Sequence, residues 1–459
     1  MIVAVPSYVQ KFCEGFCGTV WEAKRAALSC LLAGILFARG KRTQSELARC
    51  VVSEGRAASS VSRRMRRRSF GTRELVRHVT ERQIAEELAR PDARSKRWLV
   101  PIDGVCTQRG GDALIENAIK YRKKRHGDKG RSTKAHAFVQ GLVITPSGMR
   151  IPLPRRSYYT QTYVNRQNRL LKEGRRHGKR LAFKTQVDLA CLIVSELDLP
   201  KDIQVVVTAD EYFEGSKLTD MCRKKGYVFI APVDSRRTYE PTKSLHDRGK
   251  RLPRDERRKL VLRRGREDTA SSRRYSQRSA RTEARRVYRY VSERRTVAGI
   301  GTVAVVYSWK ERTDSSGTPT GKFSYKVLVC SDPTIDGALI IEWFEIRWQV
   351  EVFFRELKSD LGLEDYRGGD FTACERHYDL TLLAFMLLEQ YRADAIAAEH
   401  SPVRRRMVAT LRTSKLRAML ERKARAEDAA WFAREHRSRD GREKVLELFP
   451  AFPRTGSGD

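Results

Sequence analysis

The chain has 459 residues, of which 40% are hydrophobic and 32% are charged, a composition that excludes a largely disordered chain. This length allows two to four domains with a sizeable core. With 92 Lys plus Arg against 56 Asp plus Glu, the formal net charge is +36, and so basic a chain repels itself unless a polyanion, most commonly nucleic acid, neutralises it.

Signals for a membrane span or for secretion are weak. The longest apolar run, Ala27 to Ala38, is shorter than the roughly 20 residues that cross a bilayer. The N-terminus from Met1 to Val9 lacks the basic and apolar segments of a secretory signal. Nine cysteines are scattered, and the close pair Cys13 and Cys17 has no second pair to complete a zinc site. We therefore expect a cytoplasmic protein that does not contact a membrane.

Residues 1–92 have a helical pattern. Thr43, with Glu46 three positions later, matches a capping box at the start of a short helix. A turn at Ser53-Glu54-Gly55 and a second, basic helix follow, an order typical of a helix-turn-helix, although any basic helical hairpin fits it equally well. A third helix is expected from Thr72 to Ala89. The candidate phosphate contacts at the end of the second helix are Arg63, Arg64, Arg66 and Arg67.

Residues 93–235 change to a pattern of strands and helices. The strand expected at 203–208 is a continuous β-branched run, which is typical of a strand buried on both faces. A hairpin is expected where Pro146-Ser147-Gly148 joins two apolar segments. The other expected elements are strands at 97–105 and 227–231 and helices at 184–197 and 215–225. This order predicts an α/β fold with a mixed sheet.

Residues 236–330 interrupt that pattern, and we interpret them as a β-rich insertion. Up to about Arg295 the stretch is crowded with charge and has little apolar periodicity, and strands are expected at 296–308 and 321–330. Residues 331–400 return to helix, with a long amphipathic helix from Asp336 to Leu361 and an apolar helix at 376–398. We expect residues 401–459 to be a basic helical C-terminal region with a disordered Gly/Ser tail.

Three acidic residues stand where a carboxylate needs a partner. Asp103 interrupts an apolar strand, Asp210 directly follows another, and Glu351 lies on the long helix among apolar neighbours. Buried acids are expensive unless they are paired or bind a metal. Two strand acids and one helix acid provide the hard oxygen ligands that suit Mg²⁺ or Mn²⁺. Two such ions can activate a nucleophile and stabilise a leaving oxygen, which phosphodiester hydrolysis requires.

The helix that carries Glu351 also has a specific spacing of residues. At about 100° per residue, Phe344, Arg347, Glu351 and Lys358 fall within a stripe about 60° wide. Arg347 and Glu351 alone would be an ordinary i,i+4 ion pair. A metal site in which the carboxylate binds the ion and the cations bind phosphate is the alternative that the apolar neighbours favour.

The segment from Phe344 to Lys358 resembles the Tyr-Arg-Glu-Lys signature of bacterial insertion-sequence DDE transposases, with phenylalanine at the tyrosine position. The segments WLVPIDGVCTQ and VVVTADEYFEGSKLTDMCRKKGYVFIAPV resemble the two aspartate blocks of the same family. The resemblance covers roughly residues 97–390. It implies a ribonuclease-H-like core with a β-rich insertion between the second aspartate and the glutamate, which is where the composition changes at 236–330.

By this resemblance, Asp103, Asp210 and Glu351 would bind two Mg²⁺ or Mn²⁺ ions and carry the catalysis. Neighbouring acids are the alternatives. Glu211 could replace Asp210, and Glu351 has two rivals, Glu356 and Asp360. We favour the first set because only Glu351 has the signature spacing to both cations of the stripe.

The resemblance also implies DNA contacts. Arg347 and Lys358 would bind transposon-end DNA near the scissile phosphate, and Phe344 would do so without the hydroxyl that the signature has there. Trp309 lies in the insertion, where relatives stack an aromatic side chain on a flipped base. A tryptophan packed within a strand is the commoner explanation for this residue.

We therefore expect a cut-and-paste DNA transposase that acts on terminal inverted repeats and target DNA, as a homodimer assembled on double-stranded DNA in a bacterial nucleoid. Two alternatives remain open. One is a nuclease of the same fold without strand transfer, and the other is a basic DNA-binding protein whose acids are structural.

Overall fold

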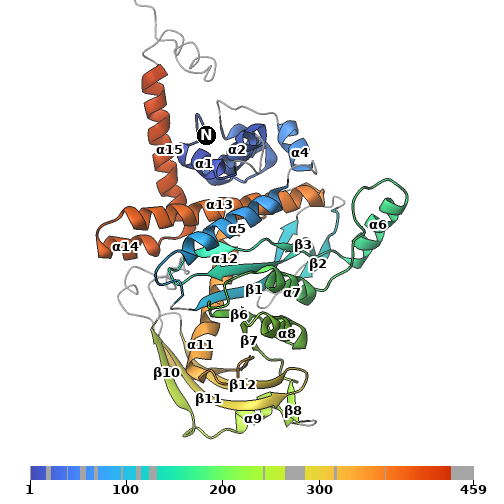
Figure 1. Ribbon diagram of the computed structural model, residues 1–459, viewed down its shortest axis with the longest axis vertical. Coiled ribbons are helices and arrows are strands. Elements are labelled where there is room, and N and C mark those ends of the chain that lie inside the picture. Colours follow the sequence, from blue (N-terminus) through green and yellow to red (C-terminus); the bar gives the residue numbers. More distant parts are fainter. Residues whose placement is uncertain are drawn as a thin grey trace, which may run out of the picture. The chain divides into compact units, whose positions relative to one another are not determined.

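In the computed structural model, the chain forms two compact units. The helical unit comprises residues 1–79, 109–116 and 355–459, and the sheet unit comprises residues 80–108 and 117–354. The structure describes residues 2–16, 22–38, 40–51, 58–66, 71–94, 97–109, 115–122, 132–240, 243–263, 285–314, 318–366 and 368–435. Figure 1 labels the elements of both units.

The helical unit is built around one long apolar helix. Its helices are α1 (Ser7–Glu14), α2 (Glu22–Phe37), α3 (Gln44–Arg49), α4 (Ala58–Arg66), α13 (Phe371–Ala398), α14 (Pro402–Ala409) and α15 (Thr413–Glu435). Helices α5 (Thr72–Leu88) and α12 (Trp348–Ser359) each belong partly to this unit. Helix α13 contacts α2, α4, α14 and α15, and it begins five residues before the predicted helix. None of the described helices is long and apolar enough to cross a membrane.

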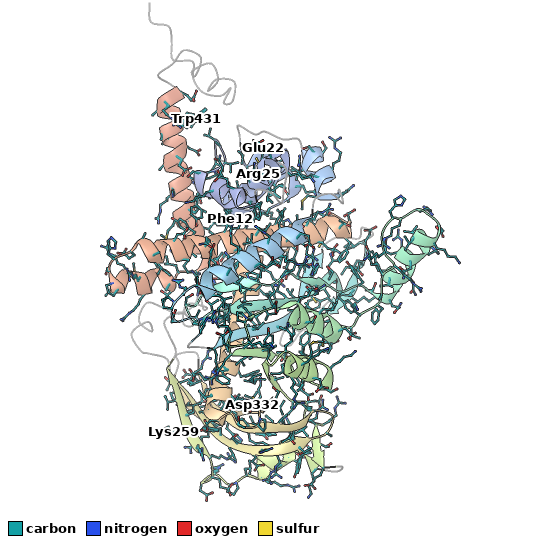
Figure 2. The ribbon with its side chains drawn as sticks, viewed as in Figure 1. Phe12, Glu22, Arg25, Lys259, Asp332 and Trp431 are labelled. Atoms are coloured by element: carbon teal, nitrogen blue, oxygen red, sulfur yellow. The ribbon has the colours of Figure 1, made fainter. Side chains whose placement is uncertain are left out.

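Polar contacts from α13 fix the N-terminal helices. The buried Arg376 side chain donates to the carbonyl of Met65 at the end of α4. The Thr72 hydroxyl, at the start of α5, donates to the Asp379 carboxylate over 2.7 Å. Both contacts are buried, where hydrogen bonds hold one geometry because water cannot replace them. Figure 2 shows Phe12 and Trp431, which lie in α1 and α15 of this unit.

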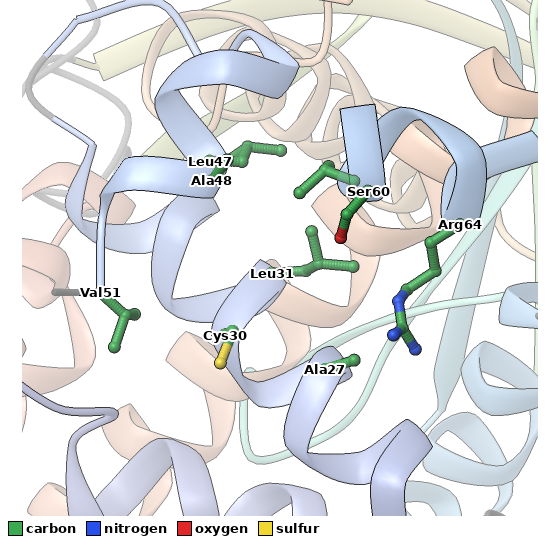
Figure 3. Close-up of a pocket in the computed structure, with 9 residues that line it drawn as sticks. Ala27, Cys30, Leu31, Leu47, Ala48, Val51, Ser60 and Arg64 are labelled. Carbon is green, nitrogen blue, oxygen red and sulfur yellow. The ribbon is translucent and has the colours of Figure 1, made fainter. Parts of the chain in front are cut away.

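The capping signal at the start of α3 is confirmed, because the Thr43 side chain accepts from the backbone N–H of Glu46. Helices α3 and α4 contact each other, and the turn predicted between them lies outside the described residues. A small pocket is lined by side chains from α2, α3 and α4, including Leu31, Leu47 and Arg64 (Figure 3). The three helices therefore pack as one group.

One large mixed sheet forms the sheet unit. Its main path runs β10-β11-β12-β13-β7-β6-β1-β3-β2, and β4 and β5 also pair with β3. The strands are β1 (Trp98–Arg109), β2 (Ile119–Arg122), β3 (Ser132–Ile144), β4 (Arg150–Pro152), β5 (Arg156–Ser157), β6 (Val205–Ala209), β7 (Val228–Pro232), β10 (Arg258–Arg263), β11 (Arg285–Val297), β12 (Gly301–Thr313) and β13 (Pro319–Cys330). A separate hairpin consists of β8 (Thr238–Glu240) and β9 (Lys243–Ser244).

The centre of the sheet agrees with the pattern in the sequence. Strand β6, the β-branched run, is buried at every position and pairs in parallel with both β1 and β7. A parallel strand is covered on both faces by its crossover helices, so every side chain can be apolar. The predicted hairpin is present as β3 and β4, which pair antiparallel. The mixed α/β fold with a ribonuclease-H-like core is thus confirmed.

The insertion extends the same sheet. Strand β13 pairs antiparallel with the core strand β7, and β12, β11 and β10 follow in order. Strands were expected only from residue 296 onward, but β10 and most of β11 lie before Arg295. Strand β10 has three consecutive apolar residues between basic ones, and β11 places Val and Tyr among Arg and Glu. The frequent Arg and Lys obscured a period of two that can bury one face and expose the other.

Helix α11 (Gly337–Ile346) covers one face of this sheet. It packs with Leu99, Val206 and Ile230 of the core strands and with residues of β11, β12 and β13 in one apolar cluster. Gly337 permits the close approach, because a Cβ there would lie 2.8 Å from Ser292 in β11. The neighbouring strand residues point to the opposite face, where α9 (Leu245–Arg251) packs in a second cluster.

Further helices complete the sheet unit. Thr185 and Asp188 form a capping box at the start of α7 (Gln186–Glu196). Helix α8 (Ser216–Lys224) follows β6, as the sequence predicts. Helix α6 (Gln161–Lys172) was not predicted, because its sequence is mostly polar and only Val164 is buried. A polar helix gives little hydrophobic periodicity.

A buried carboxylate joins α5 to the β3–β4 turn. Glu87 accepts hydrogen bonds from the hydroxyls of Thr145 and Ser147 and forms an ion pair of 2.8 Å with Arg90. We expect Glu87→Ala to lower the free energy of unfolding by about 2 to 4 kcal/mol, because the Thr145 and Ser147 hydroxyls would lose the buried carboxylate that accepts from both. Chemical denaturation measures this change.

Glu86→Gln is the matched control. Glu86 is about half exposed and lies 3.8 Å from Arg82, so its loss should change stability by less than about 0.5 kcal/mol. Equal effects of the two substitutions would show that the buried network adds nothing to the stability of this turn.

Candidate active site

Asp103 and Asp210 lie beside each other on neighbouring parallel strands. The register of β1 with β6 pairs Ile102 with Ala209, so the next residue on each strand is an aspartate. Because side chains alternate along a strand, both aspartates share a face with Leu99, the face that α11 covers. Neighbouring strands are about 4.8 Å apart. The two aspartates therefore lie at the same edge and on the same face of the sheet.

The helix that carries Glu351 is broken. The prediction of a single helix from Asp336 to Leu361 is wrong, because α11 ends at Ile346, α12 begins at Trp348 and Arg347 forms a turn between them. The N–H of Arg347 donates to the Phe344 carbonyl (3.1 Å) and the N–H of Val350 to the Arg347 carbonyl (3.0 Å). These are contacts of the tighter 3₁₀ type. Apolar periodicity did not reveal the break, since such a turn changes the phase of the helix only slightly.

Two cations of the insertion hold the helix just before the break. Glu345, on α11, receives two hydrogen bonds of 3.1 Å from Lys310 in β12 and pairs with Arg286 in β11. Burial raises the pKa of Glu345, but Lys310 and Arg286 outweigh it and hold the pKa below its ordinary value. The insertion thus fixes the position from which Arg347 projects.

Arg347 bridges two of the three acids. Its guanidinium lies 3.5 Å from Asp103 Oδ2 and 2.9 Å from Glu351 Oε1. The side chain is 12% exposed, so little water screens either contact. Asp103 and Glu351 come from segments far apart in the sequence, and one planar fork serves both carboxylates.

The pKa of Asp103 is raised to about 6. Burial is the largest cause, and the Asp210 and Glu351 carboxylates raise it further, whereas Arg347 and the backbone N–H of Gly104 lower it. One guanidinium therefore does not balance the negative charge that gathers here. The remaining negative charge therefore favours binding of an additional cation.

The rival acids have other surroundings. Glu356 is buried and accepts from the backbone N–H of Thr413, and the Asp360 carbonyl accepts from Arg417. These contacts belong to the helical unit. Glu211 is exposed in a short 3₁₀ helix, η1 (Glu211–Phe213), directly after Asp210. Among these acids, only Glu351 shares Arg347 with Asp103.

Two exposed aromatic residues flank the acids and were not predicted. Tyr212, two residues after Asp210, is 61% exposed, and Trp348, three residues before Glu351, is 37% exposed. Trp348 is one of the apolar neighbours of Glu351 on this helix, yet its side chain is exposed. At 100° per residue it lies on the opposite side of α12 from the buried Val350 and on the same side as Glu351. Asp210 is exposed and Asp103 and Glu351 are half-buried, and the exposed rings next to them in the chain are a signal that only exposure reveals.

The other predicted residues of the stripe have contacts of their own. Phe344 is buried, with Lys326 Nζ 5.2 Å and Arg347 5.6 Å from its ring. Both distances permit cation–π attraction. Lys358 belongs to the helical unit, where its amine lies 2.9 Å from Glu364. Phe344 thus packs beside the Arg347 guanidinium, and its ring has no hydroxyl with which to bind a ligand.

Trp309 is buried in the insertion. It belongs to the cluster that packs with α9, on the face of the sheet opposite α11. The Arg257 guanidinium covers its ring at 3.8 Å, and Tyr325 packs against it at 5.2 Å. A base could stack on this ring only after Arg257 moved, so the geometry agrees with a packed strand tryptophan.

The predicted DNA-binding arginines of the N-terminal region lie on α4. Arg63 and Arg66 are exposed, and Arg64 is half-buried, with its side chain lining the pocket of Figure 3. Arg67 lies outside the described residues. The exposed pair is thus the part of this basic run that DNA can reach directly.

The sequence model of the family described as "Transposase DDE domain" matches residues 95–387, which is more than half of the chain. The chain belongs to this family. The match includes both aspartates, the broken helix and the insertion between them. No curated protein matches the sequence. The bridge between Asp103 and Glu351 therefore lies within the domain that defines a DDE transposase.

The donor chemistry of the transposase fits a hard divalent ion. Asp103, Asp210 and Glu351 offer only carboxylate oxygens, the ligands that Mg²⁺ and Mn²⁺ prefer, and Arg347 already stands between two of them as a cation. In the part of the chain that the structure describes, no three Asp, Glu, His or Cys side chains are arranged as a ready metal cage. Arg347 occupies Asp103 Oδ2 and Glu351 Oε1, so it would compete with a metal for these carboxylates.

Asp103 makes stability depend on pH in the metal-free protein. Its folded pKa of about 6 exceeds the ordinary value of about 4, so the folded state binds the proton more tightly. Its contribution therefore favours folding at low pH and is lost as the pH rises from about 4 to about 6. Asp103→Asn removes this titration, and with EDTA present the variant should gain about 1 to 3 kcal/mol over wild type between pH 4.5 and 7.5. A difference that does not change with pH would contradict this.

Arg347 competes with a metal for the same carboxylates. Arg347→Gln should bind Mn²⁺ about tenfold more tightly than wild type in the absence of DNA, because it removes a charge in direct contact with two ligands. Calorimetry measures the affinity. Arg236→Gln is the control, since Arg236 pairs with Asp234 at an exposed position and should leave the affinity unchanged. Unchanged or weaker binding by Arg347→Gln would contradict the competition.

Proposed function

We propose that this transposase cuts DNA at transposon ends and joins the freed ends to target DNA, with Asp103, Asp210 and Glu351 as its catalytic residues. The observation that carries the proposal is the register of β1 with β6, which sets two aspartates beside each other, together with the Arg347 fork that ties Asp103 to Glu351. Membership of the DDE family supports the same assignment.

The chemistry needs two displacements at phosphorus. In the first, water attacks a phosphodiester, the bond from phosphorus to the 3′ oxygen breaks, and a 3′-hydroxyl is released. In the second, this hydroxyl attacks a target phosphodiester and displaces a target 3′ oxygen, so no oxidant and no covalent protein intermediate is needed. When bound, two divalent ions would help to activate the attacking oxygen and stabilise the leaving one.

The side chains of the chain have separate roles in this proposal. The three carboxylates hold positive charge beside the phosphate, and the pKa of Asp103 is raised mainly by its burial and further by the two neighbouring carboxylates. Arg347 can exchange its carboxylates for a phosphate oxygen, because a guanidinium binds either group with the same fork. Tyr212 and Trp348 offer exposed rings on which bases near the cut could stack.

Both ends of a transposon must be cut in concert, so we propose that two copies of the chain assemble on double-stranded DNA. The terminal inverted repeats would be bound in part by α4, through Arg63 and Arg66. Cutting and joining then occur within one protein–DNA assembly.

Single substitutions test the catalytic assignment. Asp103→Asn, Asp210→Asn and Glu351→Gln should each lower strand cleavage more than about 100-fold while leaving end binding intact, because carboxylates that hold the ions are lost and the fold is not. Cleavage of labelled end DNA and joining to a plasmid are the measurements.

Glu211→Gln is the matched control, since it makes the same kind of change one residue from Asp210 on an exposed side chain. It should keep cleavage within about threefold of wild type, an effect no larger than a modest change in surface charge. Wild-type cleavage by any of the three active-site variants would remove that residue from the site. Cleavage without joining by the wild-type protein would identify a nuclease.

A further inference from the structure

Residues 161–184 form a projection that we call the basic arm. It consists of α6 and the loop that returns from it to α7, and Figure 1 shows both standing out from the sheet unit. The chain reverses after Lys172, where the backbone N–H groups of Arg175 and Arg176 both donate to the Leu170 carbonyl. Gly174 has a φ of +66°, which glycine adopts easily. The arm is therefore an ordered turn at the end of a helix.

The arm is strongly basic. Its sequence contains eight Lys or Arg residues and one acid, Glu173. Glu173 lies 3.7 Å from Arg169 and 3.5 Å from Arg175, in contacts that are well exposed to solvent. Such exposed pairs contribute little, so these two arginines remain available to another anion. The exposed cations are Arg166, Arg169, Lys172, Arg175, Lys179, Arg180 and Lys184.

Two asparagines hold the arm in shape. The side chain of Asn168, on α6, donates to the Leu181 carbonyl (2.9 Å) and accepts from the Leu181 N–H (2.8 Å), which clamps the returning loop to the helix. At the base, Asn117 donates to the Tyr158 carbonyl and accepts from the Thr160 N–H, each over 2.9 Å. A loop fixed at both places presents its charges in a defined arrangement.

We propose that the basic arm binds the sugar–phosphate backbone of duplex DNA, without reading its sequence. This inference rests on the proposed function, since a transposase must hold DNA on both sides of a cut. The twelve residues of α6 span about 18 Å, the length of about five base pairs. Arg166, Arg169 and Lys172 follow one another at intervals of three, which keeps them on adjoining faces of the helix. Phosphates bound there would release counterions, as backbone contacts do.

The test compares salt dependence of DNA binding by the full-length protein. The arm variant carries Gln at Arg175, Lys179, Arg180 and Lys184, which are exposed and make no contact that the fold needs. Fluorescence anisotropy gives its Kd for an end-containing duplex and for an unrelated duplex from about 50 to about 400 mM KCl. Because each phosphate contact adds about 0.9 to the slope of log K against log salt, the slope should fall by about 2 or more. Affinity should fall at least about tenfold for both duplexes.

A second variant with four changes separates the arm from total charge. Gln at Arg404, Arg406, Arg422 and Lys423 removes four exposed cations from α14 and α15, and it should change the slope by less than about half as much. An equal fall in slope for both variants would overturn the proposal, as would an arm variant with wild-type affinity. A loss confined to the end-containing duplex would show sequence reading and also overturn it.

Asn168→Ala tests whether the arrangement matters, since it removes the clamp and keeps every charge. Binding should weaken about threefold or more for both duplexes. Binding equal to wild type would mean that the loop acts only as a charged tail. All binding is measured in EDTA, so the result does not depend on cleavage. A protein that binds as proposed but never cleaves would contradict the proposed function and leave the arm intact.

Discussion

The rest of the active site depends on one constraint, which is the burial of the Asp103 carboxylate near two other acids. Parallel pairing of β1 and β6 sets Asp103 beside Asp210, and Arg347 brings Glu351 to the same face. Burial and the neighbouring acids raise the pKa of Asp103 to about 6, although a guanidinium lies 3.5 Å away. The fold therefore gives up stability to concentrate negative charge, and either a proton on Asp103 or an additional cation recovers it. The break in the helix, its anchoring through Glu345 and the exposed aromatic rings all occur in the segments that carry these acids.

How far the sequence predicts the structure depends on the kind of signal. Apolar strands such as β6 and capping residues such as Thr43 are local signals, and both were predicted. Asp103, Asp210 and Glu351 stood out because acids within apolar segments conflict with their surroundings. The break at Arg347 was missed, since a single tight turn leaves apolar periodicity almost unchanged. Helix α6 was missed for the opposite reason, because it buries almost nothing.

The residues that sequence reasoning missed share one property. The role of each depends on whether its side chain is exposed. Tyr212 and Trp348 are large aromatic residues of the kind usually found in a core, yet both side chains are exposed near acids. Trp309 shows the converse. It lies in the insertion, where an aromatic residue could stack on a base, but the Arg257 side chain covers its ring. Burial of an aromatic ring is decided by long-range packing, and a local pattern does not contain that information. The site was thus predictable in its acids and unpredictable in its aromatic surroundings.

The continuity of the sheet through β13 has a consequence for how this insertion can vary. Strand β13 supplies the hydrogen-bonding partner of β7, so removing the whole insertion would leave β7 as a bare edge. Exposed edges of this kind invite pairing with other chains and aggregation. Outer strands such as β10 do not pair with a core strand, so they can change in length or be lost at a smaller cost in stability. Shortening from the outer end inward is therefore the route by which a smaller version of this protein could remain folded.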